Sequence, residues 1–178
     1  MEYRVRSTKT GRSSKRRRAA DASVVTILCL LLVLLLFKVI LVPVRITSPQ
    51  VSDLKEGELV LVDRISKYAV DYAVGDIVRA EAGSGLAEYR LAAKGGSTYS
   101  VRGGKTYLDG ALTDESAYSE GWPRGTEFEL KVPEDCVLLL PDVRSAATDP
   151  NVYLIEYNAI DGEVRFRISP LKRLAIFA

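Results

Sequence analysis

The feature that most limits the fold is an uncharged run, SVVTILCLLLVLLLF, from Ser23 to Phe37. Lys38 interrupts it, and VILVPV continues the apolar character to Val44. At about 1.5 Å per residue, a helix over residues 23–44 is about 33 Å long, which matches a hydrocarbon core of about 30 Å. We therefore expect a transmembrane anchor over 23–44, with Lys38 reaching toward the headgroups and Pro43 ending the helix.

Two other interpretations of this run compete with an anchor. A cleaved signal peptide has a shorter apolar region followed by a small-residue cleavage site, and no A-x-A sequence follows here. A buried helix of a soluble protein would need apolar partners on every side. The length and the flanking sequence favour the uncleaved anchor.

Charge is divided unevenly along the chain. Residues 1–44 hold nine of the 25 Lys and Arg residues and two of the 23 acidic ones, so the remainder is net acidic. Most of these nine precede the apolar run, including KRRR at 15–18. Because basic residues stay in the cytoplasm, we expect residues 1–22 to form a cytoplasmic tail and residues 45–178 to lie outside the membrane. This explains the basic segment without a nucleic-acid partner.

The chain has no histidine and two cysteines, Cys29 and Cys136. This composition excludes a Ser-His-Asp triad, a Cys-His dyad and any histidine-ligated metal. Since Cys29 lies inside the apolar run, a disulfide scaffold is excluded as well. We expect neither a metal nor another cofactor.

Residues 45–178 predict a mainly β domain. Short segments rich in Val, Ile, Leu and aromatic residues alternate with turn residues, and no long amphipathic helix competes with them. The predicted strands cover 58–65, 76–82, 87–93, a hairpin over 98–110, 127–132, 136–142, 151–157 and 162–168. The polar stretch 110–125 lacks periodicity, and it is either a tolerated surface insertion or a flap that carries Trp122.

Three stretches behind the apolar run resemble motifs of one protein family. They are SPQVSDLKEGELVLVDR at 48–64, YRLAAKGGS at 89–97 and PDVRSAATDPN at 141–151. In order and spacing they resemble the type I signal peptidases, bacterial serine proteases that remove signal peptides outside the membrane. The resemblance covers about residues 23–178 and implies a signal peptidase I-like antiparallel β domain behind one transmembrane helix.

The resemblance places unsuitable side chains at the positions of the family's chemistry. The nucleophile position is Pro49, the general-base position is Tyr89 and the lysine-orienting position is Ala147. Pro49 has neither a hydroxyl nor an N–H, and the unperturbed pKa of a tyrosine is about 10. Covalent catalysis needs an activated nucleophile, so we expect a non-catalytic member of the family.

Two displaced serine–lysine pairs remain as alternatives. One is Ser48 with Lys94, but Lys94 is an odd number of residues from position 89 and would face the other side of a strand. The other is Ser52 with Lys55, which needs a local geometry that the sequence does not indicate. Either pair would make the chain an active peptidase with a displaced dyad.

Other motif positions match the family and belong to its scaffold. They are Gly57, Glu58, Arg90, Asp142, Arg144 and Asp149. We predict an ion pair between Arg90 and Asp149 that braces the second motif against the third. The alternative is two solvated charges of little energetic value.

The resemblance also implies a way to bind polypeptides without cutting them. The family binds its substrate as an extended strand, and this mode does not require the nucleophile. The positions expected to meet a bound segment are Ser48, Pro49, Gln50, Val51 and Tyr89. The competing interpretation is that they line a collapsed, vestigial site.

Non-cleaving homologues of this kind are associated, in Gram-positive pilus gene clusters, with the polymerisation of sortase-linked pilins. The first hypothesis is therefore a membrane-anchored assembly factor that presents a secreted or pilin polypeptide to a sortase. The second is an active peptidase, and a third is a partner that regulates an active signal peptidase.

Overall fold

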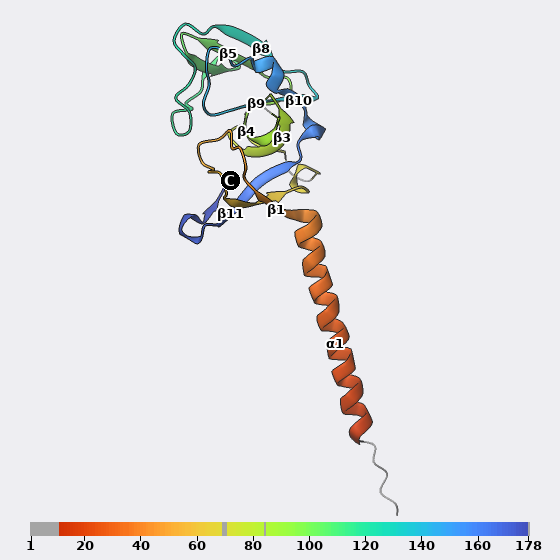
Figure 1. The fold of residues 1–178 in the computed structure, drawn as a ribbon. Coiled ribbons are helices and arrows are strands. Elements are labelled where there is room, and N and C mark those ends of the chain that lie inside the picture. Colours follow the sequence, from red (N-terminus) through yellow and green to blue (C-terminus); the bar gives the residue numbers. More distant parts are fainter. Residues whose placement is uncertain (1–10, 69–70, 84, 178) are drawn as a thin grey trace, which may run out of the picture. The chain divides into compact units, whose positions relative to one another are not determined.

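The computed structural model describes residues 11–68, 71–83 and 85–177. The chain divides into two compact units, Met1–Val39 and Ile40–Ala178. The first contains the long helix of Figure 1, and the second contains the strands.

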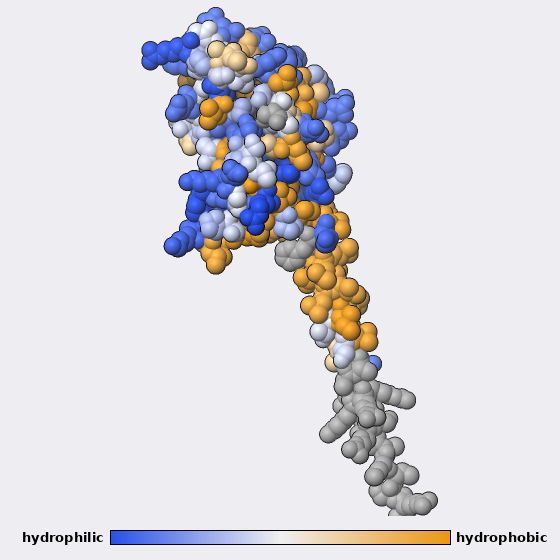
Figure 2. Space-filling view, viewed as in Figure 1, coloured by the Kyte–Doolittle hydropathy of each residue, from blue (hydrophilic) through white to orange (hydrophobic). Residues whose placement is uncertain are grey.

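The helix α1 covers Gly11–Leu35 and continues as a π-helical turn over Leu36–Ile40. Its stretch Asp21–Ile40 has a mean hydropathy of 2.9 and is long and apolar enough to cross a membrane. On the face that Figure 2 shows, the side chains of this stretch are mostly apolar. Twenty helical residues span about 30 Å, the thickness of a hydrocarbon core.

The helix ends earlier than the sequence predicts. Leu41–Arg45 form strand β1, which pairs antiparallel with β2 (Leu59–Asp63) and places Pro43 opposite Leu61. The prediction of a helix to Val44 is therefore wrong, and Pro43 does not end it. A proline is tolerated here because β1 is an edge strand, where one missing N–H leaves no ladder bond unmade inside the sheet.

Two antiparallel sheets make up the described part of residues 40–178. The larger has the order β1-β2-β11-β3-β4-β9-β10, with β12 beside β11, and the smaller has the order β7-β6-β5-β8 (Figure 1). The remaining strands of the larger sheet are β3 (Ile77–Ala82), β4 (Gly85–Ala93), β9 (Cys136–Leu140), β10 (Leu154–Glu156), β11 (Gly162–Ser169) and β12 (Ala175–Ile176). The smaller contains β5 (Thr98–Arg102), β6 (Lys105–Leu108), β7 (Ala111–Leu112) and β8 (Phe128–Lys131).

Short 3-10 helices connect several of these strands. They cover Ser66–Tyr68, Pro150–Tyr153, Tyr157–Ala159 and Leu171–Arg173. The mainly antiparallel β fold predicted from the sequence is confirmed.

The predicted hairpin over 98–110 is confirmed as β5 and β6. Gly103 and Gly104 form its two-residue loop with φ angles of 59° and 79°. Left-handed angles at both loop residues match the twist of the flanking strands, and glycine adopts them without a Cβ penalty.

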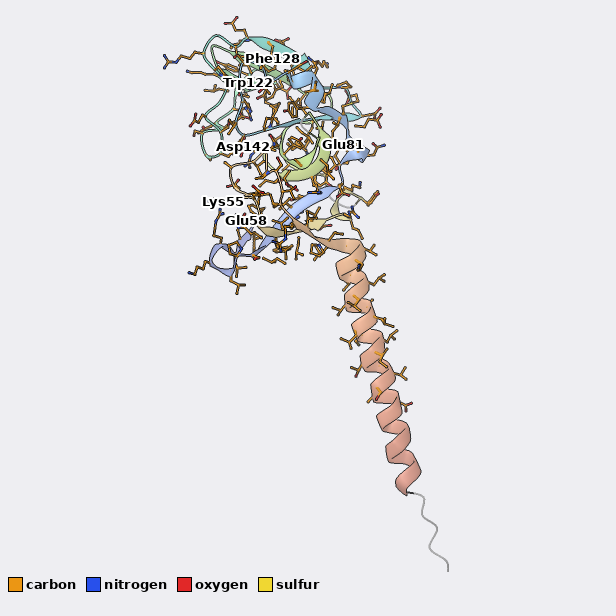
Figure 3. All side chains as sticks on the ribbon, in the orientation of Figure 1. Lys55, Glu58, Glu81, Trp122, Phe128 and Asp142 are labelled. Atoms are coloured by element: carbon orange, nitrogen blue, oxygen red, sulfur yellow. The ribbon has the colours of Figure 1, made fainter. Side chains whose placement is uncertain are left out.

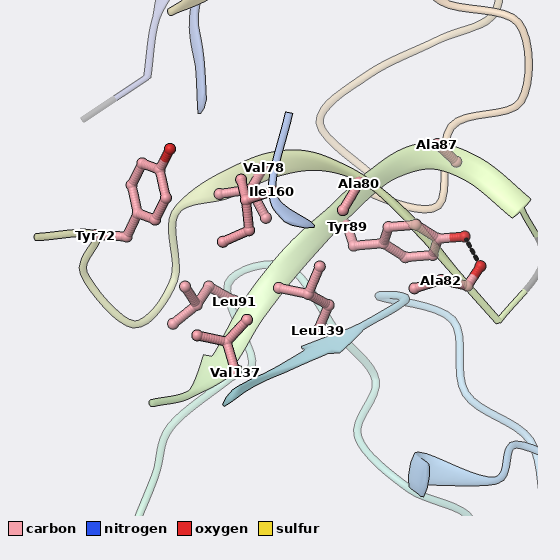
Figure 4. Close-up of a cluster of buried hydrophobic side chains, with 10 residues drawn as sticks. All are labelled: Tyr72, Val78, Ala80, Ala82, Ala87, Tyr89, Leu91, Val137, Leu139 and Ile160. Carbon is pink, nitrogen blue, oxygen red and sulfur yellow. Dashed lines mark hydrogen bonds between the residues drawn. The ribbon is translucent and has the colours of Figure 1, made fainter. Parts of the chain in front are cut away.

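Three apolar clusters hold the strand unit together. One lies under β1, β2 and β11, and a second joins β4 and β9 to the smaller sheet around Tyr99 and Trp122. The third lies on β3, β4 and β9 and contains Tyr72, Tyr89 and Leu139 (Figure 4). This third cluster decides what the predicted base position can do.

Candidate functional site

The first motif lies between the second and the third. The Gln50 N–H donates to the carbonyl of Glu88 on β4 at 3.2 Å, and the Gln50 carbonyl accepts from the Asp142 N–H at 2.8 Å. Ser48 is exposed, Pro49 and Gln50 are half-buried, and Val51 is buried in the core. The structure therefore brings the three motifs of the sequence together at one place.

Arg90 is the centre of this place. Its Nε and Nη2 donate to the two carboxylate oxygens of Asp142 at 2.8 and 2.9 Å, and Nη2 also lies 2.7 Å from Oδ2 of Asp53. Its Nη1 donates to the Gly75 carbonyl at 3.0 Å. The Arg90 and Asp142 side chains are only 7% and 1% exposed, so this is a buried bidentate pair.

Burial acts to lower the pKa of Arg90, but the hydrogen bonds to Asp142 and Asp53 outweigh it and raise that pKa. The guanidinium is therefore a fixed positive charge at any accessible pH.

A loop residue and a serine cover this pair. The Tyr118 ring lies over the Arg90 guanidinium, 3.9 Å from centroid to Cζ. The Ser52 hydroxyl lies 2.9 Å from the Asp142 carboxylate and 3.1 Å from the Tyr118 carbonyl, and the Ser52 N–H donates to the same carboxylate at 2.8 Å. Ser52 thus braces the third motif, and burial raises the pKa of Tyr118 to about 12, which keeps its phenol neutral.

The predicted pair of Arg90 with Asp149 is wrong. Asp149 is exposed, and its Oδ1 accepts from the backbone N–H and side-chain amide of Asn151, where it caps the 3-10 helix that begins at Pro150. The bracing is real, but the acids that provide it are Asp142 and Asp53. Asp142 follows β9, which pairs with β4 so that Leu140 lies opposite Arg90. This pairing places the Asp142 carboxylate beside the Arg90 guanidinium.

Tyr89 points away from this pair, into the apolar cluster on the other face of β4. It is fully buried, and its hydroxyl lies 2.7 Å from the carbonyls of Ala82 and of Gly85; Figure 4 marks the first bond. Its ring meets Tyr153 edge to face. The side chains of Tyr89 and Val51 are buried, so only their backbone can meet a bound segment, and the predicted contact at these two positions stays a prediction.

Ala147 and the two candidate lysines have contacts that do not form a catalytic pair. Ala147 is exposed in a turn in which its N–H donates to the Ser145 hydroxyl. Lys94 pairs with Asp71 at 2.7 Å, and exposed Lys55 donates its backbone N–H to Glu58. Among the hydrogen bonds of the described residues, none joins a lysine amine to a serine or threonine hydroxyl.

A second buried pair ties the loop after β7 to the third motif. Nη1 of Arg144 lies 2.5 Å from Oε2 of Glu115, and the Arg144 side chain is completely buried. The same Nη1 donates to the Tyr99 hydroxyl at 3.2 Å, and the Trp122 indole N–H donates to that hydroxyl at 3.1 Å. The stretch 110–125 is therefore clamped through buried residues, in contrast to the simple surface excursion expected.

Glu58 is a buried carboxylate of the first motif that binds two arginines from the C-terminal part of the chain. Its carboxylate binds the guanidinium groups of Arg167 and Arg173 and the N–H of Lys55. The preceding residue, Gly57, has a φ of 84°, which a residue with a Cβ rarely adopts. Figure 3 labels Glu58 and Asp142, the two motif carboxylates that anchor these networks.

Sequence reasoning missed Ser52 as a bracing residue and Asp53, Glu115 and Tyr118 altogether. For Asp53 a signal exists, because it lies in the first motif, which the resemblance brings to the second. Glu115 and Tyr118 lie in a loop without periodicity, and nothing in their local sequence indicates that they are tied down.

The family model described as signal peptidase, peptidase S26, matches residues 18–169. The chain belongs to this family. The matched range includes the Arg90–Asp142 pair, the Arg144–Glu115 pair and the three positions held by Pro49, Tyr89 and Ala147.

Among solved structures, the chain is similar to a signal peptidase I from Enterococcus faecalis V583. The two share 20% identity with a TM-score of 0.42, over 53% of this chain and 97% of that chain. No curated protein matches the chain.

Proposed function

We propose that this chain is a membrane-anchored, non-catalytic signal peptidase homologue that binds a secreted polypeptide, a pilin subunit, and presents it to a sortase. Its orientation follows the charge rule, with the basic end in the cytoplasm and residues 45–178 outside. The observation that carries the proposal is the fate of the base position, where a buried phenol bonds to backbone carbonyls. An activated hydroxyl needs a neighbouring base, and Tyr89 provides none.

Binding without cleavage is supported by the pairing of β4. This strand pairs with β3 from Gly85 to Arg90, but with β9 only from Arg90 onward. On that second side, no strand of the described residues pairs with Gly85–Glu88, and the Gln50 N–H donates to the Glu88 carbonyl there. An extended polypeptide can add to such an edge through main-chain hydrogen bonds.

The direct test is to incubate the full chain in detergent micelles with a fluorescently labelled pilin and with a labelled preprotein. We expect saturable binding of the pilin and no new fragments of either protein on a gel. A Pro49→Ser variant should also be inactive, because the base is still missing. In cells, deletion of the gene should abolish pilin polymers; normal polymers would refute the assembly role.

The second candidate is a peptidase with a displaced nucleophile, and one contact favours it. Ser52 is the first-motif serine whose hydroxyl meets a carboxylate, that of Asp142. Cleavage of the preprotein by the wild-type chain that disappears in Ser52→Ala would establish this function and overturn the first.

A further inference from the structure

A cleft of about 460 Å³ opens beside the Arg90–Asp142 pair. One wall is the loop from Ser116 to Pro123, and the other is formed by Ser52 and the segment 142–144. Its apolar lining comes from Ala117, Tyr118, Trp122, Pro123 and Val143. Val143 is 86% exposed although both of its neighbours in the chain are buried, so an apolar side chain projects at this wall.

The walls are held by contacts that do not involve a ligand. The Glu115–Arg144 pair fixes the start of the loop, the Ser119 hydroxyl donates to the Asp142 carbonyl at 2.6 Å, and Trp122 is bonded to Tyr99. A preformed site binds without the entropic cost of ordering a loop. These contacts hold both walls of the cleft in place before anything binds, although the sequence of the loop resembles a surface insertion.

The chemistry of the lining selects the kind of group that fits. The two charged groups at its base, Asp142 and Arg144, are neutralised inside the protein by Arg90 and Glu115. They leave no unpaired buried charge to attract a charged side chain, while the aromatic and aliphatic lining gains from burying apolar surface. Exposed Glu120 is the remaining charged group of the lining.

The cleft is continuous with the segment of the first motif that meets β4. Gln50 bonds to both Glu88 and Asp142, and Ser52, two residues later, lines the cleft. A polypeptide that binds against this segment therefore meets the cleft at Ser52. We propose that the cleft receives a large apolar side chain, preferably aromatic, of the bound polypeptide. This inference rests on the proposed function, because it assigns a specificity pocket to that binding site.

The cleft can be tested without a polypeptide. Trp122 is the single tryptophan of the chain and reports on the cleft directly. The full chain in detergent micelles is titrated with N-acetyl-phenylalaninamide, N-acetyl-alaninamide and N-acetyl-lysinamide while Trp122 emission is recorded. We expect a saturable change with the phenylalanine probe and affinity at least about tenfold weaker for the alanine probe, which buries less apolar surface.

Two matched variants locate the binding. Val143→Asp places a charge at the wall and should weaken the phenylalanine probe at least about fivefold. Val152→Asp changes a valine that is 52% exposed and does not line the cleft, and it should have no effect. Crosslinking with N-acetyl-4-benzoylphenylalaninamide, mapped by mass spectrometry to residues 116–123 or 143, provides a readout independent of emission.

Two results would overturn the assignment. One is the absence of both a saturable emission change and a crosslink in the cleft. The other is a preference for the lysine probe that disappears in Glu120→Gln, which would make the cleft a site for basic side chains. If the phenylalanine probe binds but no pilin or preprotein does, the cleft is real and the proposed function fails. If the pilin binds equally to wild type and Val143→Asp, the function survives and the pocket assignment fails.

Discussion

Two consecutive residues of strand β4, Tyr89 and Arg90, lie on opposite faces of the strand and make opposite kinds of contact. On one face, Arg90 joins three separate segments through charge-assisted hydrogen bonds to Asp142, Asp53 and Gly75. On the other face, Tyr89 fills an apolar cluster and bonds to carbonyls of its own hairpin. The first face holds the contacts that bring the motifs together, while the second holds the side chain at the position that the resemblance assigns to the family's base.

This difference separates the contacts that hold the three motifs together from the side chain that the resemblance places at the base position. The scaffold depends on pairs whose members must stay complementary, because removing one partner leaves a buried charge alone. The base position depends on one side chain, and an apolar core accepts a phenol there once its hydroxyl finds acceptors.

The largest expected effect is on the Arg90 face. Asp142→Ala leaves the Arg90 guanidinium buried with only Asp53, whose side chain is 46% exposed, and should destabilise the fold by about 3–5 kcal/mol. Chemical unfolding of the full chain in micelles measures this. Arg102→Ala is the control, since its pair with Glu129 is exposed and worth at most about 1 kcal/mol. Equal losses in the two variants would break the comparison.

The next largest effect is the pH dependence of stability that comes from Glu163, a buried carboxyl whose ion pair is weaker than that of Asp142. Glu163 on β11 lies opposite Asp63 on β2 and 3.0 Å from partly exposed Arg165. Burial first, then the charges of Asp76 and Asp63, raise its pKa from 4.5 to about 7. Because the folded state then binds a proton more tightly than the unfolded state, the contribution of this group to stability is greatest below pH 4.5 and falls as the pH rises to about 7.

Unfolding measured from pH 4 to 8 tests this sign. The wild-type chain should lose on the order of 2 kcal/mol from this group across the interval, and Glu163→Gln should flatten the loss. Glu88 keeps part of the slope in the variant, because burial also raises its pKa. A slope that is unchanged in Glu163→Gln would contradict the assignment.

A smaller effect is expected on the Tyr89 face. Tyr89→Phe removes the hydroxyl and leaves buried carbonyls of Ala82 and Gly85 without that donor, so it should cost about 1–2 kcal/mol. Pilin binding should be unchanged, because the side chain does not reach the surface. Loss of binding in a variant that remains folded would show that this face participates after all.

The smallest effect is expected for Asp149→Ala. Asp149 is exposed, and among the described residues its side chain bonds only to Asn151, so the unfolding midpoint should move less than in Asp142→Ala or Tyr89→Phe. A loss equal to that of Asp142→Ala would restore the pairing with Arg90 that the sequence suggests.

Most of the β fold could be predicted because its strands alternate and its turns contain glycine. The edge strands β1, β7 and β12 were missed, since two of them have two residues and β1 continues the apolar run of the helix. Apolar content alone cannot separate the end of a membrane helix from a strand that begins at the next residue.

The site could be predicted in part. The resemblance identifies the motifs that meet, but Asp142 and Asp149 both match the third motif, and only the register of β9 on β4 decides which one reaches Arg90. The Glu115–Arg144 clamp could not be predicted, because it joins residues 29 positions apart across a loop without any repeating pattern.

Pro43 has a consequence for crowding at the bilayer. The edge strands of a sheet can pair with the edge strands of a neighbouring molecule. Proteins that share one membrane encounter one another often, so this pairing matters more for them. At one end of the larger sheet an imino acid interrupts the row of donors, and at the other end β10 has only three residues. Such blunted margins disfavour self-association through the two ends of the larger sheet.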